Sequence, residues 1–117
     1  AEKITFVEKN NNIAKILKKK LSDLNIKENV NLVVDSTTNF LVKNFSNKYE
    51  IIFLDPPFAD DSYIEDLKII KQKKNFKKNH VIIIHREIKS FEDFNKILDP
   101  ILIKEYGRSK IIFGRFL

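Results

Sequence analysis

The sequence predicts an α/β protein with a mostly parallel sheet, and two features of its 117 residues carry this prediction. Short runs of consecutive apolar residues alternate along the chain with segments in which apolar residues recur at helical spacing. Near the end, the segments Ile101–Tyr106 and Lys110–Phe116 flank Gly107-Arg108-Ser109, which is typical of an antiparallel hairpin. We therefore expect a parallel sheet that gains one antiparallel edge strand from this C-terminal hairpin.

The first half of the chain contains two expected strands and two expected helices. The apolar segments Ile4–Val7 and Asn31–Val34 are the strands. Helical spacing predicts a helix over residues 11–24, whose inward stripe consists of Ile13, Leu17, Leu21 and Leu24. The polar residues 35–38 are good helix caps and predict a short second helix with the inward residues Phe40, Leu41 and Phe45.

The second half repeats the alternation. Residues 51–54 and 81–84 are continuous apolar runs, which predict strands buried on both faces. Between them, a helix over residues 63–73 is expected to face inward with Ile64, Leu67 and Ile70. A further short helix is expected over residues 91–98.

Composition limits the class of protein. A hydrophobic fraction of 43% and ten Phe indicate a globular chain, and the length fits a single domain over residues 1–117. No apolar run approaches the roughly 20 residues of a membrane span, and the start lacks a secretory pattern, so we expect no membrane contact. The chain has no Cys, which excludes disulfides and thiolate metal sites and fits a cytoplasmic location.

The net charge of +6 favours an anionic partner such as nucleic acid. The sequence contains two clusters of Lys residues. One lies in the first expected helix (Lys15, Lys18, Lys19), and the other lies around the end of the 63–73 helix (Lys71, Lys73, Lys74, Lys77, Lys78). Solvated helix faces and favourable cations at a helix end explain both groups equally well. The abundance of Lys, Asn and Ile is also what an AT-rich coding sequence imposes, so the charge is weak support for RNA binding.

The most informative segment is Asp55-Pro56-Pro57-Phe58, directly after the apolar run 51–54. Neither proline donates a backbone hydrogen bond, and Pro57 holds Pro56 extended, so the strand must end here. A stiff loop results at the carboxyl end of a central strand, where open α/β sheets bind ligands. Its carboxylate, free carbonyls and aromatic ring suit a planar base with an exocyclic amine. An ordinary strand-ending turn is the competing interpretation.

This motif resembles that of S-adenosylmethionine-dependent amino-methyltransferases, which have Asp/Asn-Pro-Pro-Tyr/Phe at this place. With Thr5–Asn10 and Tyr106–Phe113, it resembles the RsmD family, which methylates the N2 amine of a guanine in small-subunit ribosomal RNA. The resemblance covers the chain and implies a Rossmann-like methyltransferase fold. It also implies S-adenosyl-L-methionine as cofactor, and ribosomal RNA or the small ribosomal subunit as partner. We expect a monomer.

The resemblance assigns catalysis to Asp55, Pro56, Pro57 and Phe58. The exocyclic amine is a poor nucleophile because its lone pair is delocalised into the purine. If Asp55 and the Pro56 carbonyl accept its two hydrogens, the nitrogen can pyramidalise toward the methyl group, and the developing positive charge is stabilised. Phe58 would stack on the unstacked base. Asp55 then orients and polarises the amine and need not remove a proton.

The resemblance places the cofactor near Glu8, Asp35 and Ser36. Glu8 follows a strand and would accept hydrogen bonds from ribose hydroxyls, although a surface Glu is an equal alternative. Asp35 and Ser36 compete for the position beside the adenine, and the neighbouring Thr37 is equally well explained as a helix cap. The family has a Glu where this chain has His85, and we assign His85 no proton-transfer role. Arg86, Arg108 and Lys110 are candidates for phosphate contacts, and exposed basic residues need no such role.

The chain departs from the family at its beginning. Its only glycines are Gly107 and Gly114, so the family's first strand and glycine-rich loop are missing, and the chain opens at Ala1 rather than Met. We therefore expect a fragment, a partial methyltransferase domain that binds cofactor poorly and lacks turnover alone. Two alternatives stay open: a DNA adenine or cytosine amino-methyltransferase, and a non-catalytic RNA-binding module with the same fold.

Overall fold

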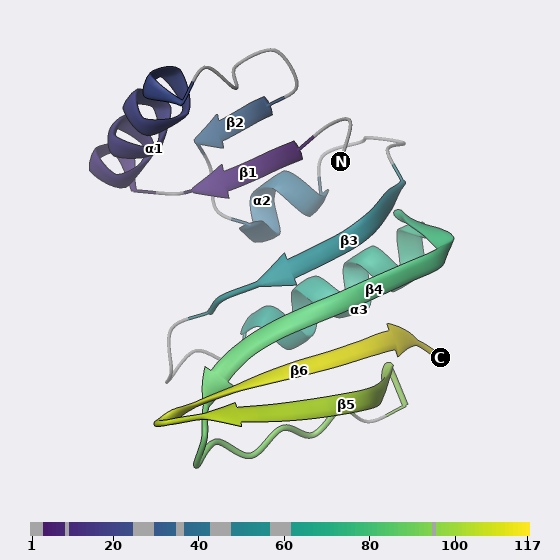
Figure 1. Ribbon diagram of the computed structural model, residues 1–117. Helices are drawn as coiled ribbons and strands as arrows, with labels where there is room; N and C mark the ends of the chain where they lie inside the picture. The colour runs from purple at the N-terminus through teal and green to yellow at the C-terminus, as the bar shows by residue number, and fades with distance from the viewer. Residues whose placement is uncertain are drawn as a thin grey trace. The chain divides into compact units, whose positions relative to one another are not determined.

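A computed structural model describes residues 4–8, 10–24, 30–34, 37–42, 48–56, 62–94 and 96–117, although the side chains of residues 4, 8, 30–34, 37–38 and 42 are not described. The chain divides into two compact units, Ala1–Asn44 and Phe45–Leu117. Each unit combines a pair of parallel strands with at least one helix, as the sequence predicts (Figure 1).

The first unit is a strand–helix–strand motif followed by a short helix. Strands β1 (Ile4–Glu8) and β2 (Val30–Val34) pair in parallel, with Ile4 opposite Val30 and Glu8 opposite Val34. Helix α1 (Asn11–Asp23) connects them, and α2 (Thr37–Val42) follows β2 (Figure 1). The carboxyl ends of both strands therefore lie at the same edge of this small sheet.

Helix α1 begins at a side-chain cap. The Oδ1 atom of Asn10 accepts hydrogen bonds from the backbone N–H groups of Asn12 (2.9 Å) and Ile13 (3.2 Å). The expected apolar stripe is only partly correct. Leu17 and Leu21 are half-buried, whereas Ile13 and Leu24 are exposed and Ala14 is the buried residue of the helix. In the second helix, Leu41 is buried as predicted, and Phe45 lies outside the described residues.

The second unit is a four-stranded sheet with the order β3-β4-β6-β5. Its strands are β3 (Tyr49–Leu54), β4 (Phe76–Glu87), β5 (Leu98–Tyr106) and β6 (Ser109–Phe116). Strands β3 and β4 are parallel, while β6 is antiparallel to both β4 and β5. The hairpin prediction is confirmed, but the antiparallel strand is not at the edge: β6 lies between β4 and β5 (Figure 1).

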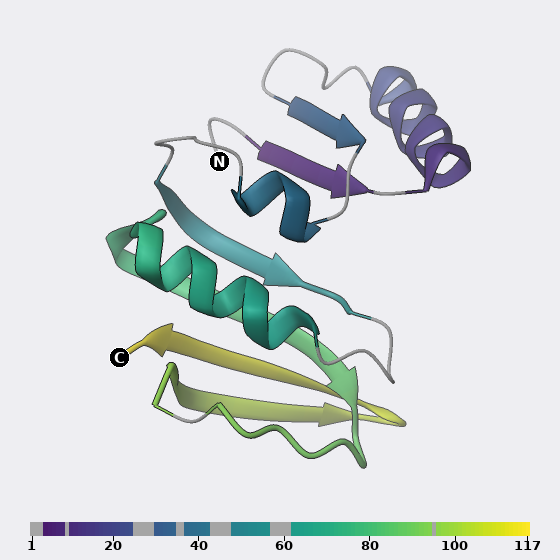
Figure 2. The same cartoon turned by 180° about the vertical axis from the view of Figure 1, so that it is seen from behind.

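Helix α3 (Ser62–Lys73) covers one face of this sheet (Figure 2). Its buried apolar residues are Tyr63, Leu67 and Ile70, and those of the sheet include Ile82, Ile84 and Ile112. Alternate residues of a strand point to opposite faces, so this packing explains why the buried residues of β3 and β4 are all even-numbered. On the other face, Ile51 and Phe53 are each 59% exposed. The expectation that residues 51–54 are buried on both faces is therefore wrong, because α3 is the one helix described in this unit.

Two further expectations need correction. Strand β4 extends beyond the predicted residues 81–84 at both ends: Phe76 pairs with Tyr49 of β3, and residues 85–87 pair with β6. His80 adds a contact between the first half of β4 and the end of β6. The Nε2 atom of His80 accepts a hydrogen bond from the Phe116 N–H (3.0 Å), which leaves Nδ1 to donate to the Lys77 carbonyl (2.8 Å). The expected helix over residues 91–98 is not formed by the described residues there. Tertiary contacts override its helical pattern: Glu92 is held by side chains of β4 and β6, and Leu98 is already the first residue of β5.

Candidate functional site

Asp55 follows directly after β3, at the carboxyl end of the strand. Its side chain is 61% exposed. The carboxylate is thus available to a ligand rather than turned into the protein interior, as the sequence-based hypothesis requires. Pro56 comes next and is half-buried, whereas Pro57 and Phe58 lie outside the described residues.

The side chain of Asp55 meets His85 from the neighbouring strand. Leu54 and Ile84 are paired in the parallel ladder, so the residues that follow them, Asp55 and His85, stand side by side. The Nδ1 atom of His85 lies 2.9 Å from Oδ1 of Asp55. An ionised carboxylate only accepts hydrogen bonds, so Nδ1 carries the hydrogen and donates it.

Sequence reasoning missed this pair, although a signal for it exists. The apolar runs 51–54 and 81–84 have the same length, and the structure pairs them residue by residue from Ile51–Val81 to Leu54–Ile84. Two parallel strands in this register place the first polar residue after each run at the same sheet edge. The equal lengths of the runs, taken with this register, therefore place Asp55 beside His85.

Arg86, the next residue of β4, points to the opposite face. Its guanidinium carbon lies 4.8 Å from the ring centroid of Tyr63 in α3, a cation–π contact. Its Nε lies 3.4 Å from Oε2 of Glu92, and its side chain is only 3% exposed. Arg86 therefore contributes to the interior of the protein, and the suggestion that it contacts phosphate is wrong.

Lys110 belongs to the same internal network. Its Nζ lies 2.5 Å from Oε1 of Glu92 and donates to the carbonyl of Ser90 (2.7 Å). The Ser90 hydroxyl in turn donates to Glu92. Burial on its own raises the pKa of Glu92, but hydrogen bonds from Lys110 and Ser90, the charge of Lys110 and a hydrogen bond from Arg86 hold that pKa below its usual value. Of the three basic candidates, Arg108 is the exposed one.

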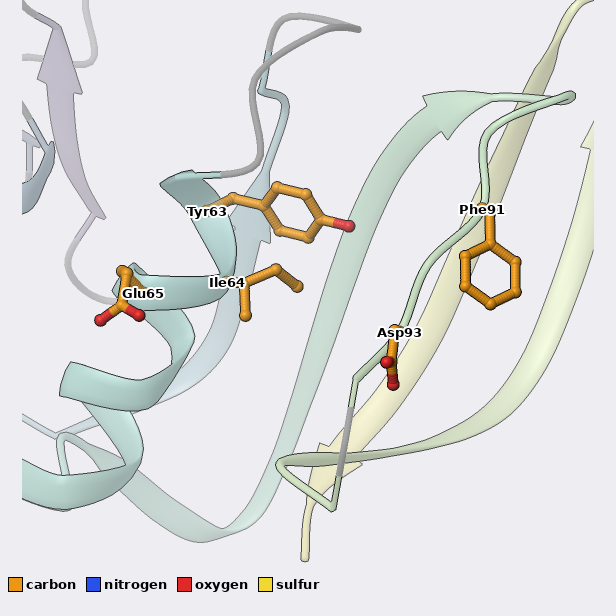
Figure 3. Close-up of a pocket in the computed structure, with 5 residues that line it drawn as sticks. All are labelled: Tyr63, Ile64, Glu65, Phe91 and Asp93. Carbon is orange, nitrogen blue, oxygen red and sulfur yellow. The ribbon is translucent and has the colours of Figure 1, made fainter.

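An open pocket of about 410 Å³ lies on the α3 side of the sheet. Tyr63, Ile64 and Glu65 come from the first turn of α3, and Phe91 and Asp93 come from the segment after β4 (Figure 3). Asp55 is not among the residues that line it. His85 alternates with Arg86 along β4, so the Asp55–His85 pair and this pocket belong to opposite faces of the sheet. The pocket is therefore not the predicted catalytic site.

The predicted cofactor residues belong to the first unit. Glu8 is the last residue of β1, and its backbone pairs with Val34, the last residue of β2. Asp35 and Ser36 come immediately after that strand and lie outside the described residues. This edge of parallel strands is where open α/β sheets bind ligands. The described residues contain no group of three or more His, Asp or Glu suited to a metal ion, and no described helix is long and apolar enough to span a membrane.

Comparison with known proteins adds relatives of named function. The chain is 37% identical over 73 residues to the ribosomal RNA small subunit methyltransferase D of Buchnera aphidicola, covering 62% of this chain and 38% of that protein. It is 35% identical over 75 residues to an uncharacterized methylase, RP545, of Rickettsia prowazekii, covering 62% of this chain and 31% of that protein. The chain thus spans about a third of the length of these curated relatives.

Solved structures support the fold. The Haemophilus influenzae protein HI0767, a methylase by name, superimposes with a TM-score of 0.84 at 23% identity, covering 100% of this chain and 74% of that chain. A methyltransferase from Geobacter sulfurreducens superimposes with a TM-score of 0.70 at 14% identity, covering 97% of this chain and 58% of that chain. At these identities the similarity establishes the Rossmann-like methyltransferase fold.

The match to a family of sequences spans nearly the whole chain. The sequence model of the family described as "Conserved hypothetical protein 95" matches residues 1–115. That family includes RsmD, so the resemblance noted in the sequence is confirmed. The chain belongs to the Conserved hypothetical protein 95 family, that of the RsmD methyltransferases.

Proposed function

We propose that the protein is an S-adenosylmethionine-dependent methyltransferase that modifies the exocyclic N2 amine of a guanine in small-subunit ribosomal RNA. The observation that carries this proposal is the exposed carboxylate of Asp55 at the carboxyl end of β3, within the Asp-Pro-Pro-Phe motif. Membership of the family supports the reaction class. The Buchnera relative, named for ribosomal RNA of the small subunit, supports the substrate.

The catalytic role assigned to this segment is electrostatic and positional. Asp55 Oδ1 already accepts the His85 hydrogen, and the side chain that carries the second carboxylate oxygen is 61% exposed. An exocyclic N–H of the base would donate to that oxygen and a second to the Pro56 carbonyl. Two fixed acceptors localise the lone pair on the nitrogen and stabilise its developing positive charge. Pro57 stiffens the segment, and Phe58 stacks on the base.

The cofactor site belongs to the edge formed by β1 and β2. The residues at this edge would hold S-adenosylmethionine, which when bound would supply the methyl group for transfer to the amine. Glu8 suits the ribose because a carboxylate accepts hydrogen bonds from two vicinal hydroxyls, and it stands at the carboxyl end of a parallel strand. Asp35 and Ser36 follow the adjacent strand β2 and are the candidates for contact with the adenine. The donor and acceptor chemistry of these residues fits the group.

The partner of this reaction is ribosomal RNA, free or within the small subunit, and the reaction is cytoplasmic because that is where the substrate is assembled. The net charge of +6 suits an RNA substrate. The activity, the substrate and a monomeric state are proposed for the whole protein, since the chain spans about a third of its curated relatives.

The test uses the protein expressed from its complete reading frame. It is incubated with labelled S-adenosylmethionine and with small-subunit ribosomal RNA, assembled small subunits or DNA, and the modified nucleosides are identified by mass spectrometry. We expect N2-methylguanosine from a ribosomal substrate and a loss of roughly 10²–10³-fold in turnover for Asp55→Ala. Methylated adenine or cytosine in DNA would instead show that the protein is a DNA amino-methyltransferase. RNA binding without any product would establish the non-catalytic module.

A further inference from the structure

We propose that His85 is a positioning residue for the Asp55 carboxylate. Its Nδ1–H holds one carboxylate oxygen so that the other is presented to the base amine in a fixed direction. This inference rests on the proposed function, and it adds to the reaction a residue outside the Asp-Pro-Pro-Phe motif. The contact that carries it is the 2.9 Å separation of His85 Nδ1 and Asp55 Oδ1.

The two residues differ in how firmly their surroundings hold them. Asp55 lies just beyond β3 with 61% of its side chain exposed, whereas His85 lies within β4 with 29% exposed. His85 is paired with Ile111 of β6, and the residue before it, Ile84, is paired with both Leu54 of β3 and Ile112 of β6. His85 is therefore the more firmly held donor, and Asp55 is the more exposed acceptor.

The neighbours of His85 favour donation of its hydrogen bond toward Asp55. On the β6 side, His85 is paired with Ile111, an apolar residue. On the β3 side, it meets the Asp55 carboxylate. A half-buried position between these neighbours could be filled by an apolar side chain, so the use of imidazole is explained by its N–H donor. Donation from Nδ1 also defines the tautomer: in the neutral ring, Nε2 is left as the acceptor.

Orientation of Asp55 matters because the acceptor must act on one particular N–H bond. An exposed Asp side chain samples several rotamers, and selecting one of them during the reaction costs free energy that a preformed hydrogen bond has already supplied. His85 therefore lowers the barrier without touching the base, the methyl donor or the transferred group. Its effect should fall on kcat more than on KM, since the substrate is held by many other contacts.

Three substitutions separate the hydrogen bond from the packing. In His85→Asn, the side-chain amide nitrogen can occupy the position of Nδ1 and still donate to Asp55. In His85→Gln, the amide nitrogen matches Nε2 instead, and His85→Ala has no donor. With the protein from its complete reading frame and its ribosomal substrate, we expect kcat to fall about tenfold in the Gln and Ala variants, with KM changed less than about threefold. The Asn variant should keep kcat within about threefold of the natural enzyme.

A double-mutant cycle tests whether His85 acts through Asp55. Adding His85→Ala to Asp55→Ala should lower the residual rate no further, because the group that His85 positions is already absent. Thermal unfolding of each variant serves as the control for folding. A wild-type kcat in His85→Ala, or equal losses in the Asn and Ala variants of unchanged stability, would overturn the positioning role.

A second readout does not depend on activity. Nitrogen-15 NMR of the imidazole should show His85 protonated at Nδ1 in the natural protein, and this state should be lost in Asp55→Ala. Protonation at Nε2 alone would overturn the pair itself. A natural protein that transfers no methyl group would overturn the proposed function and the catalytic role of His85 together. In an active enzyme, insensitivity to the His85 series would overturn only the role of His85.

Discussion

Lys110 of β6 and Glu92 of the β4–β5 connection form an ion pair in the protein interior, with Nζ 2.5 Å from Oε1. The side chains are 13% and 5% exposed. Arg86 approaches the other carboxylate oxygen of Glu92. One buried carboxylate therefore pairs with two cations from adjacent strands and holds the segment that the sequence predicted as a helix.

Removing this carboxylate should destabilise the fold strongly. Glu92→Ala leaves Arg86 and Lys110 without their counter-charge in a largely buried place, which costs about 3–5 kcal/mol of the free energy of unfolding. Urea denaturation measures the loss. The matched control is Glu50→Ala, since Glu50 forms an exposed pair with Lys77 at 3.4 Å, and we expect less than about 1 kcal/mol there. Similar losses in both variants would contradict the central role of Glu92.

The lowered pKa of Glu92 predicts a dependence of stability on pH. The unfolded chain has the usual Glu pKa of 4.5, and the folded pKa lies below it. The unfolded state then binds more protons in this range, so the contribution of Glu92 is fully present above pH 4.5 and is lost as the pH falls through the folded pKa. The free energy of unfolding, measured between pH 7 and pH 3, should fall more steeply in the natural protein than in Glu92→Gln. Parallel curves would refute the assignment.

Gly114 of β6 is expected to tolerate no side chain. A Cβ there would lie 2.9 Å from the carbonyl oxygen of Asp99, and contacts with Leu98 are nearly as close. Gly114→Ala should therefore cost about 1–3 kcal/mol of stability, because backbone of β5 must shift. Gly107→Asn provides the comparison. Gly107 has a φ of +55° and open space around it, and Asn tolerates that conformation, so its thermal midpoint should change much less.

The cofactor proposal predicts a specific loss of affinity at Glu8. In the protein from its complete reading frame, Glu8→Ala should raise the Kd for S-adenosylmethionine about tenfold. This corresponds to a loss of roughly 1.4 kcal/mol, which is the order of magnitude expected for hydrogen bonds to a carboxylate. Isothermal titration calorimetry provides the measurement. Asp23→Asn, an exposed carboxylate at the end of α1, is the control and should bind normally. An unchanged affinity in Glu8→Ala would remove this residue from the cofactor site.

The elements that could be predicted from the sequence are those with a strong local pattern. The apolar run 51–54 predicts β3, the helical spacing of residues 63–73 predicts α3, and the turn at Gly107 predicts the hairpin of β5 and β6. In each case the pattern that decides the local structure lies within the element itself. Asp55 could also be placed at a strand end, because two prolines must terminate the strand.

The remaining features depend on contacts between residues that are distant in the sequence. The first half of β4 is mostly polar, and its partners are Tyr49 of β3, which pairs with Phe76, and the end of β6, which His80 contacts. Arg residues are mostly exposed in proteins, so nothing local indicates that Arg86 is covered by Tyr63 and paired with Glu92. The His85 contact with Asp55 follows from the register of two strands rather than from either residue alone.

The position of β6 between β4 and β5 has a consequence for how the molecule is made. Residues 109–116 are synthesised after all the other strands described here, yet they join β5 to the remainder of the second sheet. A nascent chain that has reached only Tyr106 has no partner for β5 and leaves one side of β4 open. Until β6 is synthesised, β4 and β5 each keep unpaired backbone N–H and C=O groups. Association between incomplete chains would begin at these groups.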